Sequence, residues 1–212
     1  DHEGDHIQVA LHGSATITTA TLSGNPTTAT GANLGGGITI SHGGTFTGTH
    51  TVNITGNNIQ GANVQSINVN VGSHQAPADV RATISNNIIG TAGIAGSGGN
   101  IGIEAEINGV AATTGGVLTT LISNNFIREY VDQGIQIQAT DGAGNNATLN
   151  ATITGNTVTE ALAAGAGFAA IFVSANNNNT VCVDIGGAGG LSNTLSGTGF
   201  ASDISIQTAT GA

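Results

Sequence analysis

A short phrase recurs along this 212-residue chain at a nearly constant interval. It consists of an aliphatic residue, a Ser or Thr, a Gly or Asn, and then an Asn. Its copies are Leu22-Ser23-Gly24-Asn25, Ile54-Thr55-Gly56-Asn57, Ile84-Ser85-Asn86-Asn87, Ile122-Ser123-Asn124-Asn125 and Ile153-Thr154-Gly155-Asn156, followed by a decayed copy at Ile185-Gly186-Gly187. Successive copies begin 32, 30, 38, 31 and 32 residues apart. A fixed period in this range is typical of stacked repeats.

Each repeat also contains a run in which Ile or Val alternates with polar residues, as in Ser66-Ile67-Asn68-Val69-Asn70-Val71. Alternation of this kind predicts a strand with one buried and one solvated face. A third short strand is expected directly after each phrase, for example at Asn58-Ile59. Gly and β-branched residues interrupt every window, and both disfavour helix.

A repeat of short strands and turns cannot bury its apolar face alone, whereas coaxial stacking buries a continuous core. We therefore predict an all-β fold, a single-stranded right-handed parallel β-helix of about six coils. The predicted solenoid domain covers residues 15–212. Residues 1–14 are expected to form either an N-terminal extension or the start of the first coil.

The last Asn of each phrase is predicted to lie at a corner between two strands. Asn tolerates the left-handed backbone conformation that such a bend requires. Equivalent Asn side chains of successive coils can then stack and form hydrogen bonds along the solenoid. The predicted structural ladder consists of Asn25, Asn57, Asn87, Asn125 and Asn156.

The repeated phrase, together with the alternating Ile runs, resembles the right-handed parallel β-helix repeats of large secreted bacterial surface proteins. The segment from Val181 to Ile206 also resembles the last coil of such a region, and the resemblance covers most of residues 15–207. It implies the β-helix fold and an extracellular or cell-surface location. The fold also occurs in pectate lyases, polygalacturonases and phage tailspikes, so it does not by itself define an activity.

The charge of the chain restricts its partners. The formal net charge is −10, and Arg81 and Arg128 are the only Lys or Arg residues. Two cations cannot form the basic track that nucleic acid binding requires. No run of 18 apolar residues exists, so membrane insertion is not expected. The single cysteine, Cys182, lies in an apolar run and is predicted to be a buried small hydrophobe.

The acidic residues are widely spread and show no paired Asp cluster like that of β-helix glycosidases. The sequence therefore predicts no enzymatic activity and no required cofactor. One acidic pair is a candidate binding element, because Glu104 and Glu106 should point outward from a strand whose Ile residues point inward. Neighbouring coils should place polar residues beside the pair, and the predicted strip, a candidate site for a glycan or for Ca²⁺, consists of Asn68, Asn70, Glu104, Glu106, Gln136 and Gln138.

Four other features of the sequence carry residue types that occur in functional sites. The start of the chain carries metal-ligand types at His2, Glu3, Asp5 and His6. The segment 128–132 could be a binding loop, although a local ion pair is favoured. His42 and His50 flank a Gly- and Thr-rich segment and are expected at the surface. Outward Ser and Thr residues near each phrase resemble an ice-binding hydroxyl ladder, which Asn53, Leu121, Asp184 and Gly186 interrupt.

These observations favour an extracellular structural or adhesive module, such as a stalk, surface or matrix element. Its expected partners are flanking β-helix coils or further copies of itself, including end-to-end assembly into a filament. The alternative is a carbohydrate-binding or polysaccharide-degrading protein that uses the strip around Glu104 and Glu106, and ice binding is a minor alternative. Functional residues are expected at departures from the repeat, above all in the 38-residue interval after Ile84.

Overall fold

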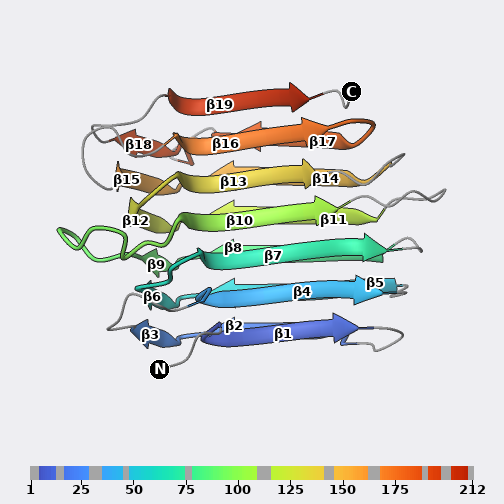
Figure 1. Ribbon diagram of the computed structural model, residues 1–212, viewed down its shortest axis with the longest axis horizontal. Helices are drawn as coiled ribbons and strands as arrows, with labels where there is room; N and C mark the ends of the chain where they lie inside the picture. Colours follow the sequence, from blue (N-terminus) through green and yellow to red (C-terminus); the bar gives the residue numbers. More distant parts are fainter. Residues whose placement is uncertain are drawn as a thin grey trace.

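The computed structural model describes residues 5–12, 17–28, 35–44, 48–74, 78–108, 116–140, 146–161, 168–187, 191–196 and 202–209. Within these residues the chain forms strands and turns and contains no helix. The strands form three parallel sheets that wrap around a common core (Figure 1). This architecture confirms the predicted right-handed parallel β-helix.

Sheet A has the most strands and lies at the front of Figure 1. Its seven strands, in spatial order, are β1 (Ile7–His12), β4 (Ile38–Gly44), β7 (Gln65–His74), β10 (Ile101–Asn108), β13 (Gln133–Thr140), β16 (Ala169–Asn176) and β19 (Ser202–Ala209). Because β1 pairs with β4, residues 7–12 already belong to the first coil.

Sheets B and C contain six strands each. Sheet B consists of β2 (Thr19–Ser23), β5 (Gly48–Thr55), β8 (Ala78–Ser85), β11 (Val117–Ser123), β14 (Thr148–Thr154) and β17 (Thr180–Ile185). Sheet C consists of β3 (Pro26–Thr28), β6 (Asn58–Gln60), β9 (Ile88–Ile89), β12 (Phe126–Tyr130), β15 (Thr157–Ala161) and β18 (Thr194–Ser196). The short sheet C strands are the third strands that the sequence predicts after each phrase.

The core is built from columns of aliphatic side chains in strict register. In sheet A one column contains Ile38, Ile67, Ile103, Ile135 and Ile171, all fully buried. The aliphatic residue of each phrase forms a second column in sheet B, and residues such as Ile59 and Ile127 form a third in sheet C. Each coil thereby covers the apolar surface of the coil below it, which is the main stabilising term expected for a repeat stack.

The corner where the chain enters sheet A requires small residues. A Cβ atom added at Gly37 would lie 2.6 Å from Cγ2 of Ile59, and one added at Gly102 would lie 2.6 Å from Cγ2 of Ile127. The side of these glycines that faces sheet C is therefore already filled by core side chains. This close approach explains why Gly precedes the Ile run in several repeats.

The predicted Asn ladder is present as a continuous hydrogen-bonded row. Each Asn donates from its Nδ2 to Oδ1 of the Asn in the next coil at 2.9 Å, and its backbone N–H donates to the same oxygen at 2.9–3.0 Å. From the second coil onward, Nδ2 also donates to the carbonyl of the phrase's aliphatic residue one coil below, as Asn87 does to Ile54. The row consists of Asn25, Asn57, Asn87, Asn125, Asn156 and Asn193.

Two features of this row go beyond or differ from the prediction. Asn193 continues the ladder past Asn156, although the phrase at Ile185 has decayed. The left-handed backbone also lies one residue earlier than expected. The residue before the ladder Asn has φ between 56° and 67° in Gly24, Gly56, Asn86, Asn124 and Gly155. The third position of the phrase is restricted to Gly or Asn because these residues tolerate that conformation.

Candidate functional site

The outward face of sheet A carries hydrogen-bonding side chains from three neighbouring strands. The register pairs Glu104 with Asn68 on one side and Gln136 on the other. Glu106 pairs in the same way with Asn70 and Gln138. We refer to these six residues as the sheet A strip. The alternation of the strands thus places them side by side, as expected from the sequence.

Glu106 is held by donors from both neighbouring strands. Asn70 donates from Nδ2 to Oε2 of Glu106 at 2.6 Å, and the Thr140 hydroxyl donates to Oε1 at 2.9 Å. Asn108 also donates to Oδ1 of Asn70 at 3.4 Å. Thr140 and Asn108 were not among the predicted strip residues. They continue the outward alternation of β13 and β10 and could have been found by extending it two residues further.

Glu104 lies deeper, with only 5% of its surface exposed. Gln136 donates from Nε2 to its Oε1 at 3.1 Å, and the Gln65 side chain also forms a hydrogen bond with it. Burial raises the pKa of Glu104 to about 7, repulsion from Glu106 adds to this rise, and the bond to Gln65 opposes it. Glu104 is therefore a carboxyl group that changes its protonation near neutral pH.

The polar face continues past the strip toward an aromatic pair. In β16, Phe172 pairs with Gln136 and Ser174 pairs with Gln138, so both follow the strip residues in the same outward columns. The ring of Phe168 meets that of Phe172 edge to face, with centroids 5.4 Å apart, and Phe168 is 37% exposed.

Two side-chain oxygens on this face are buried without a hydrogen-bond partner within the described part of the chain. Oδ1 of Asn68 lies in the column of Glu104, and the hydroxyl of Ser174 lies in the column of Glu106. Ser174 is only 6% exposed. Buried polar atoms normally have partners. The sheet A face therefore holds acceptors beyond those used by its own side chains.

The segment 128–132 does not form the local ion pair that the sequence favoured. The guanidinium of Arg128 lies 4.9 Å from the ring centroid of Phe126, and its Nε donates to the carbonyl of Gly90 at 3.1 Å. Glu129 adopts a left-handed conformation with φ of 53° and accepts the backbone N–H of Gly93 at 2.8 Å. Both charged residues thus hold the long turn between β9 and β10, which projects beside sheet C in Figure 1.

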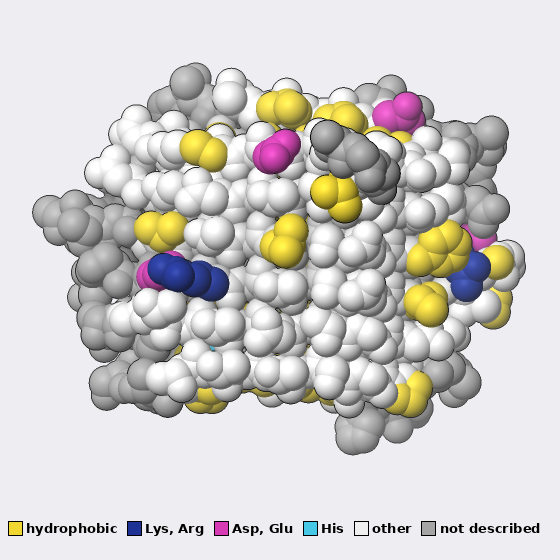
Figure 2. Space-filling view, turned by 180° about the vertical axis from the view of Figure 1, so that it is seen from behind, with side chains coloured by type: hydrophobic (Ala, Val, Ile, Leu, Met, Phe, Trp, Pro, Cys, Tyr) yellow, Lys and Arg dark blue, Asp and Glu magenta, His cyan; other side chains and the backbone are white. Residues whose placement is uncertain are grey.

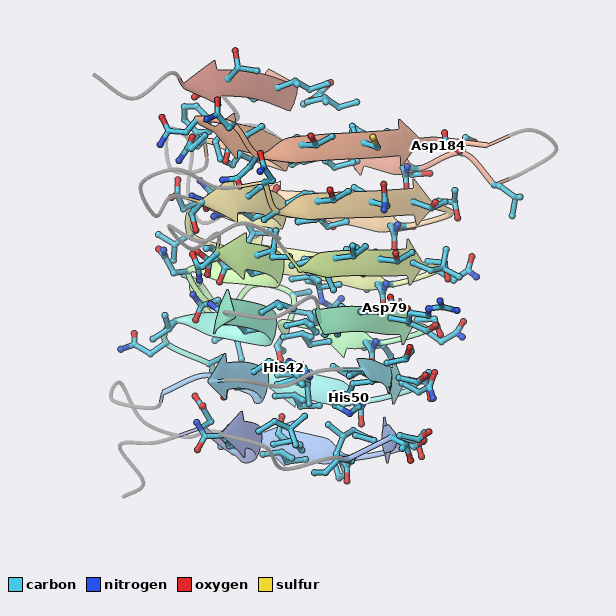
Figure 3. The ribbon with its side chains drawn as sticks, turned by 90° about the vertical axis from the view of Figure 1, so that its right-hand side faces the viewer. His42, His50, Asp79 and Asp184 are labelled. Atoms are coloured by element: carbon cyan, nitrogen blue, oxygen red, sulfur yellow. The ribbon has the colours of Figure 1, made fainter. Side chains whose placement is uncertain are left out.

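His42 and His50 are buried rather than at the surface, with exposures of 2% and 0%. They extend from β4 and β5, and Nε2 of His42 forms a hydrogen bond with Nδ1 of His50 (Figure 3). Burial lowers the pKa of His50. The expectation failed because the inward alternation of Ile38 and Ile40 in β4, and of Ile54 and Val52 in β5, continues to these histidines.

Cys182 is exposed, which contradicts its predicted burial. In β17 the partly buried positions are Val181, Val183 and Ile185, so Cys182 points outward between them. It ends an outward column of sheet B that includes Thr19, Thr51 and Thr119.

The outer face of sheet B is polar and carries few charges. Figure 2, seen from behind, shows scattered charged side chains on a surface of mostly uncharged residues. Among the described residues the single salt bridge joins Arg81 to Asp79 at 2.8 Å on this face. The hydroxyl column that begins at Thr21 is interrupted in register by Asn53, Leu121 and Asp184. Ice binding stays a prediction.

The candidate metal ligands at the start of the chain are only partly described. His2 and Glu3 lie outside the described residues. Oδ1 of Asp5 accepts the backbone N–H of Gly36 at 2.7 Å, which ties the start of the first coil to the turn before β4. Within the described ranges, no three His, Cys, Asp or Glu side chains gather in a way that could hold a metal ion.

The described residues contain no helix that is long and apolar enough to span a membrane. Comparison of the chain with models of protein families, with curated proteins and with solved structures gives no significant match.

Proposed function

We propose that this chain is an extracellular structural module, a segment of a rigid β-helical stalk or surface element. The observation that supports the proposal best is the apolar end of sheet A. Ile204 and Ile206 in β19 pair with Ile171 and Val173, which are 0% and 2% exposed. Yet Ile204 and Ile206 are 43% and 63% exposed. The same core columns thus end in open apolar surface, which usually marks an interaction site.

The numbers of strands in the three sheets indicate what kind of partner can stack on this end of the solenoid. Sheet A has seven strands, whereas sheets B and C have six, so β19 begins a coil that has no described strands in the other two sheets. A second copy stacked in register through its β1 would leave sheets B and C one strand short at the joint. The proposed occupant is therefore a parallel coil that first supplies strands in sheets B and C and then covers Ile204 and Ile206.

The rest of the molecule suits a load-bearing spacer. The Asn ladder and the aliphatic columns run through the stack from coil to coil, and each added coil lengthens the rod by about 4.8 Å. Stability in such a stack is approximately the sum of repeat and interface terms, so added coils stabilise their neighbours.

The joint can be tested by adding a coil. Residues 141–176, which contain β14, β15 and β16, would be duplicated after residue 209. The extension should raise the melting temperature and lower the fluorescence of a dye that binds exposed apolar surface. A matched control would carry Ser in place of the duplicated Leu149 and Ile153. The proposed joint is wrong if the extended protein and the control melt at the same temperature, or if the unextended chain assembles into filaments.

The location needs a separate test. An antibody raised against the chain should label intact cells of the source organism, and proteinase K added to intact cells should remove the signal. Labelling that appears only after the cells are permeabilised would contradict an extracellular role.

A further inference from the structure

The sheet A face combines carboxylates, amides and an aromatic pair in one line along the solenoid axis. The line runs from Asn68 in β7 through Glu104 and Gln136 to Phe172 in β16. A parallel column joins Asn70 to Ser174 through Glu106 and Gln138. Three strand spacings separate the ends, which corresponds to about 14 Å.

The length of this line and its side chains distinguish a single bound ion from an extended ligand. The oxygens of Asn68 and Ser174 that have no partner among the described residues belong to strands three spacings apart. A single Ca²⁺ ion binds oxygens within about 2.6 Å and cannot contact both. An extended ligand with many hydroxyl or amino donors could reach acceptors along the whole line. The strand spacing of about 5 Å is also close to the length of one sugar ring in an extended chain.

The aromatic pair offers a surface of a different kind at one end of the line. Phe172 is partly exposed and Phe168 is 37% exposed, and their edge-to-face contact fixes the orientation of both rings. Ligand sites typically combine an apolar surface with a few placed polar groups. A sugar ring has an apolar face of C–H groups and a polar rim of hydroxyls. It therefore matches an aromatic ring next to amides and a carboxylate.

The charge of the face sets the class of sugar. The only two Lys or Arg side chains of the chain, Arg81 and Arg128, lie in β8 of sheet B and β12 of sheet C. Glu106 is thus free of a neighbouring Lys or Arg that could neutralise an acidic sugar. Repulsion disfavours polyuronates, whereas neutral sugars and protonated amino sugars can donate to the carboxylate.

We propose that the outer face of sheet A, from Asn68 to Phe172, binds an extended neutral or amino-sugar glycan whose chain runs across the strands, parallel to the solenoid axis. Glu106, Gln138 and Phe172 contact the sugar rings. Glu104 and Gln136 lie beneath and hold these groups in position. The proposal does not depend on the stalk function, because a binding face on the side of the rod leaves both of its ends free.

The proposal is tested by titration calorimetry with four defined hexasaccharides: those of β-1,4-glucose, β-1,4-N-acetylglucosamine, β-1,4-glucosamine and α-1,4-galacturonic acid. At least one of the first three should bind, and the galacturonic acid hexamer should not. Glu106→Gln and Phe172→Ala should each weaken binding about tenfold or more, because each removes a contact worth roughly 1.4 kcal/mol or more. Thr119→Ala, on the exposed face of sheet B, should leave the affinity unchanged.

Folding of the variants is checked by their melting curves, and Gln138→Ala serves as a second, partly exposed variant that should also weaken binding. In the unaltered protein, amide resonances of β10, β13 and β16 should shift on sugar addition, and those of β5 and β8 should not. The proposal is overturned if none of the first three hexasaccharides binds, if the galacturonic acid hexamer binds best, if the resonance shifts lie in sheet B, or if binding survives all three sheet A substitutions. Binding of Ca²⁺ without any sugar binding would equally overturn it.

Discussion

Nδ2 of Asn57 donates a 2.9 Å hydrogen bond to Oδ1 of Asn87, a residue 30 positions further along the chain. The backbone N–H of Asn57 donates to the same oxygen at 2.9 Å. One side-chain oxygen therefore fixes both the corner of one coil and its register with the next. The same arrangement in the neighbouring coils makes the ladder a continuous constraint along the solenoid.

Asn87→Ala should be strongly destabilising. The substitution leaves two donors of Asn57 without their acceptor in a fully buried site. It also removes the Nδ2 donor to the carbonyl of Ile54 and one of the two donors to Oδ1 of Asn125. An unfolding free energy lower by about 2–4 kcal/mol is expected from unpaired buried polar groups. Urea denaturation measures the change. Asn58→Ala, at the exposed neighbouring position, should cost less than about 0.5 kcal/mol, and equal losses at the two positions would contradict the role of the ladder.

Gly102→Ala should destabilise the protein through steric overlap. The added methyl would lie 2.6 Å from Cγ2 of Ile127 and also against the carbonyl of Gly134. Overpacking of this kind typically costs about 1–3 kcal/mol. Ile127→Ala in the same chain removes one of the clashing atoms, so the double variant should lose less stability than the sum of the two single variants. Strict additivity in urea unfolding would show that the corner has room for a side chain.

Much of the architecture follows from the sequence because a solenoid repeats one local solution. The period, the inward Ile columns and the Asn ladder all follow from spacing and alternation. Asn193 was missed because the phrase before it has decayed, although the pattern Asn-Thr-Leu at 193–195 repeats the Asn-x-aliphatic pattern at Asn57 and Asn156. Burial of His42 and exposure of Cys182 could both have been read from the alternation of their strands.

Other features could not be derived from alternation. The left-handed conformation of Glu129 breaks the period of two, so the directions of Arg128 and Glu129 depend on the turn they pack against. Glu104 is more deeply buried than Glu106. This difference likewise depends on the way in which the long side chains of three neighbouring coils pack over one another. Strand register places such residues side by side but does not determine the conformations of their side chains.

Glu104→Gln should stabilise the protein at alkaline pH and have little effect in acid. The folded-state pKa of Glu104 is about 7, compared with an ordinary value of 4.5, so the folded protein holds this proton more tightly. Its contribution to stability is complete below about pH 4.5 and is lost as pH rises through about 7. A gain of about 3 kcal/mol is expected at pH 9. Melting curves at pH 4.5 and pH 9 should diverge, and a constant difference between wild type and variant across this range would contradict the burial effect.

His50 should make the protein sensitive to acid. Because burial lowers its pKa in the folded state, the unfolded chain takes up a proton more readily. Its contribution to stability is present above about pH 6.5 and is lost as pH falls below that value. His50→Gln keeps a polar side chain next to His42 but cannot be protonated. The variant should therefore lose less stability than the wild type between pH 7 and pH 5, and parallel curves would exclude His50 as the cause.

The most direct test of the stacked architecture is a distance between two spin labels in one column of sheet B. The exposed Cys182 supplies one attachment site and Thr19→Cys supplies the other, 163 residues away along the chain. Five strand spacings separate the two positions, which predicts a narrow distance distribution centred near 24 Å. A broad distribution, or one centred beyond about 40 Å, would contradict the continuous parallel stack of coils.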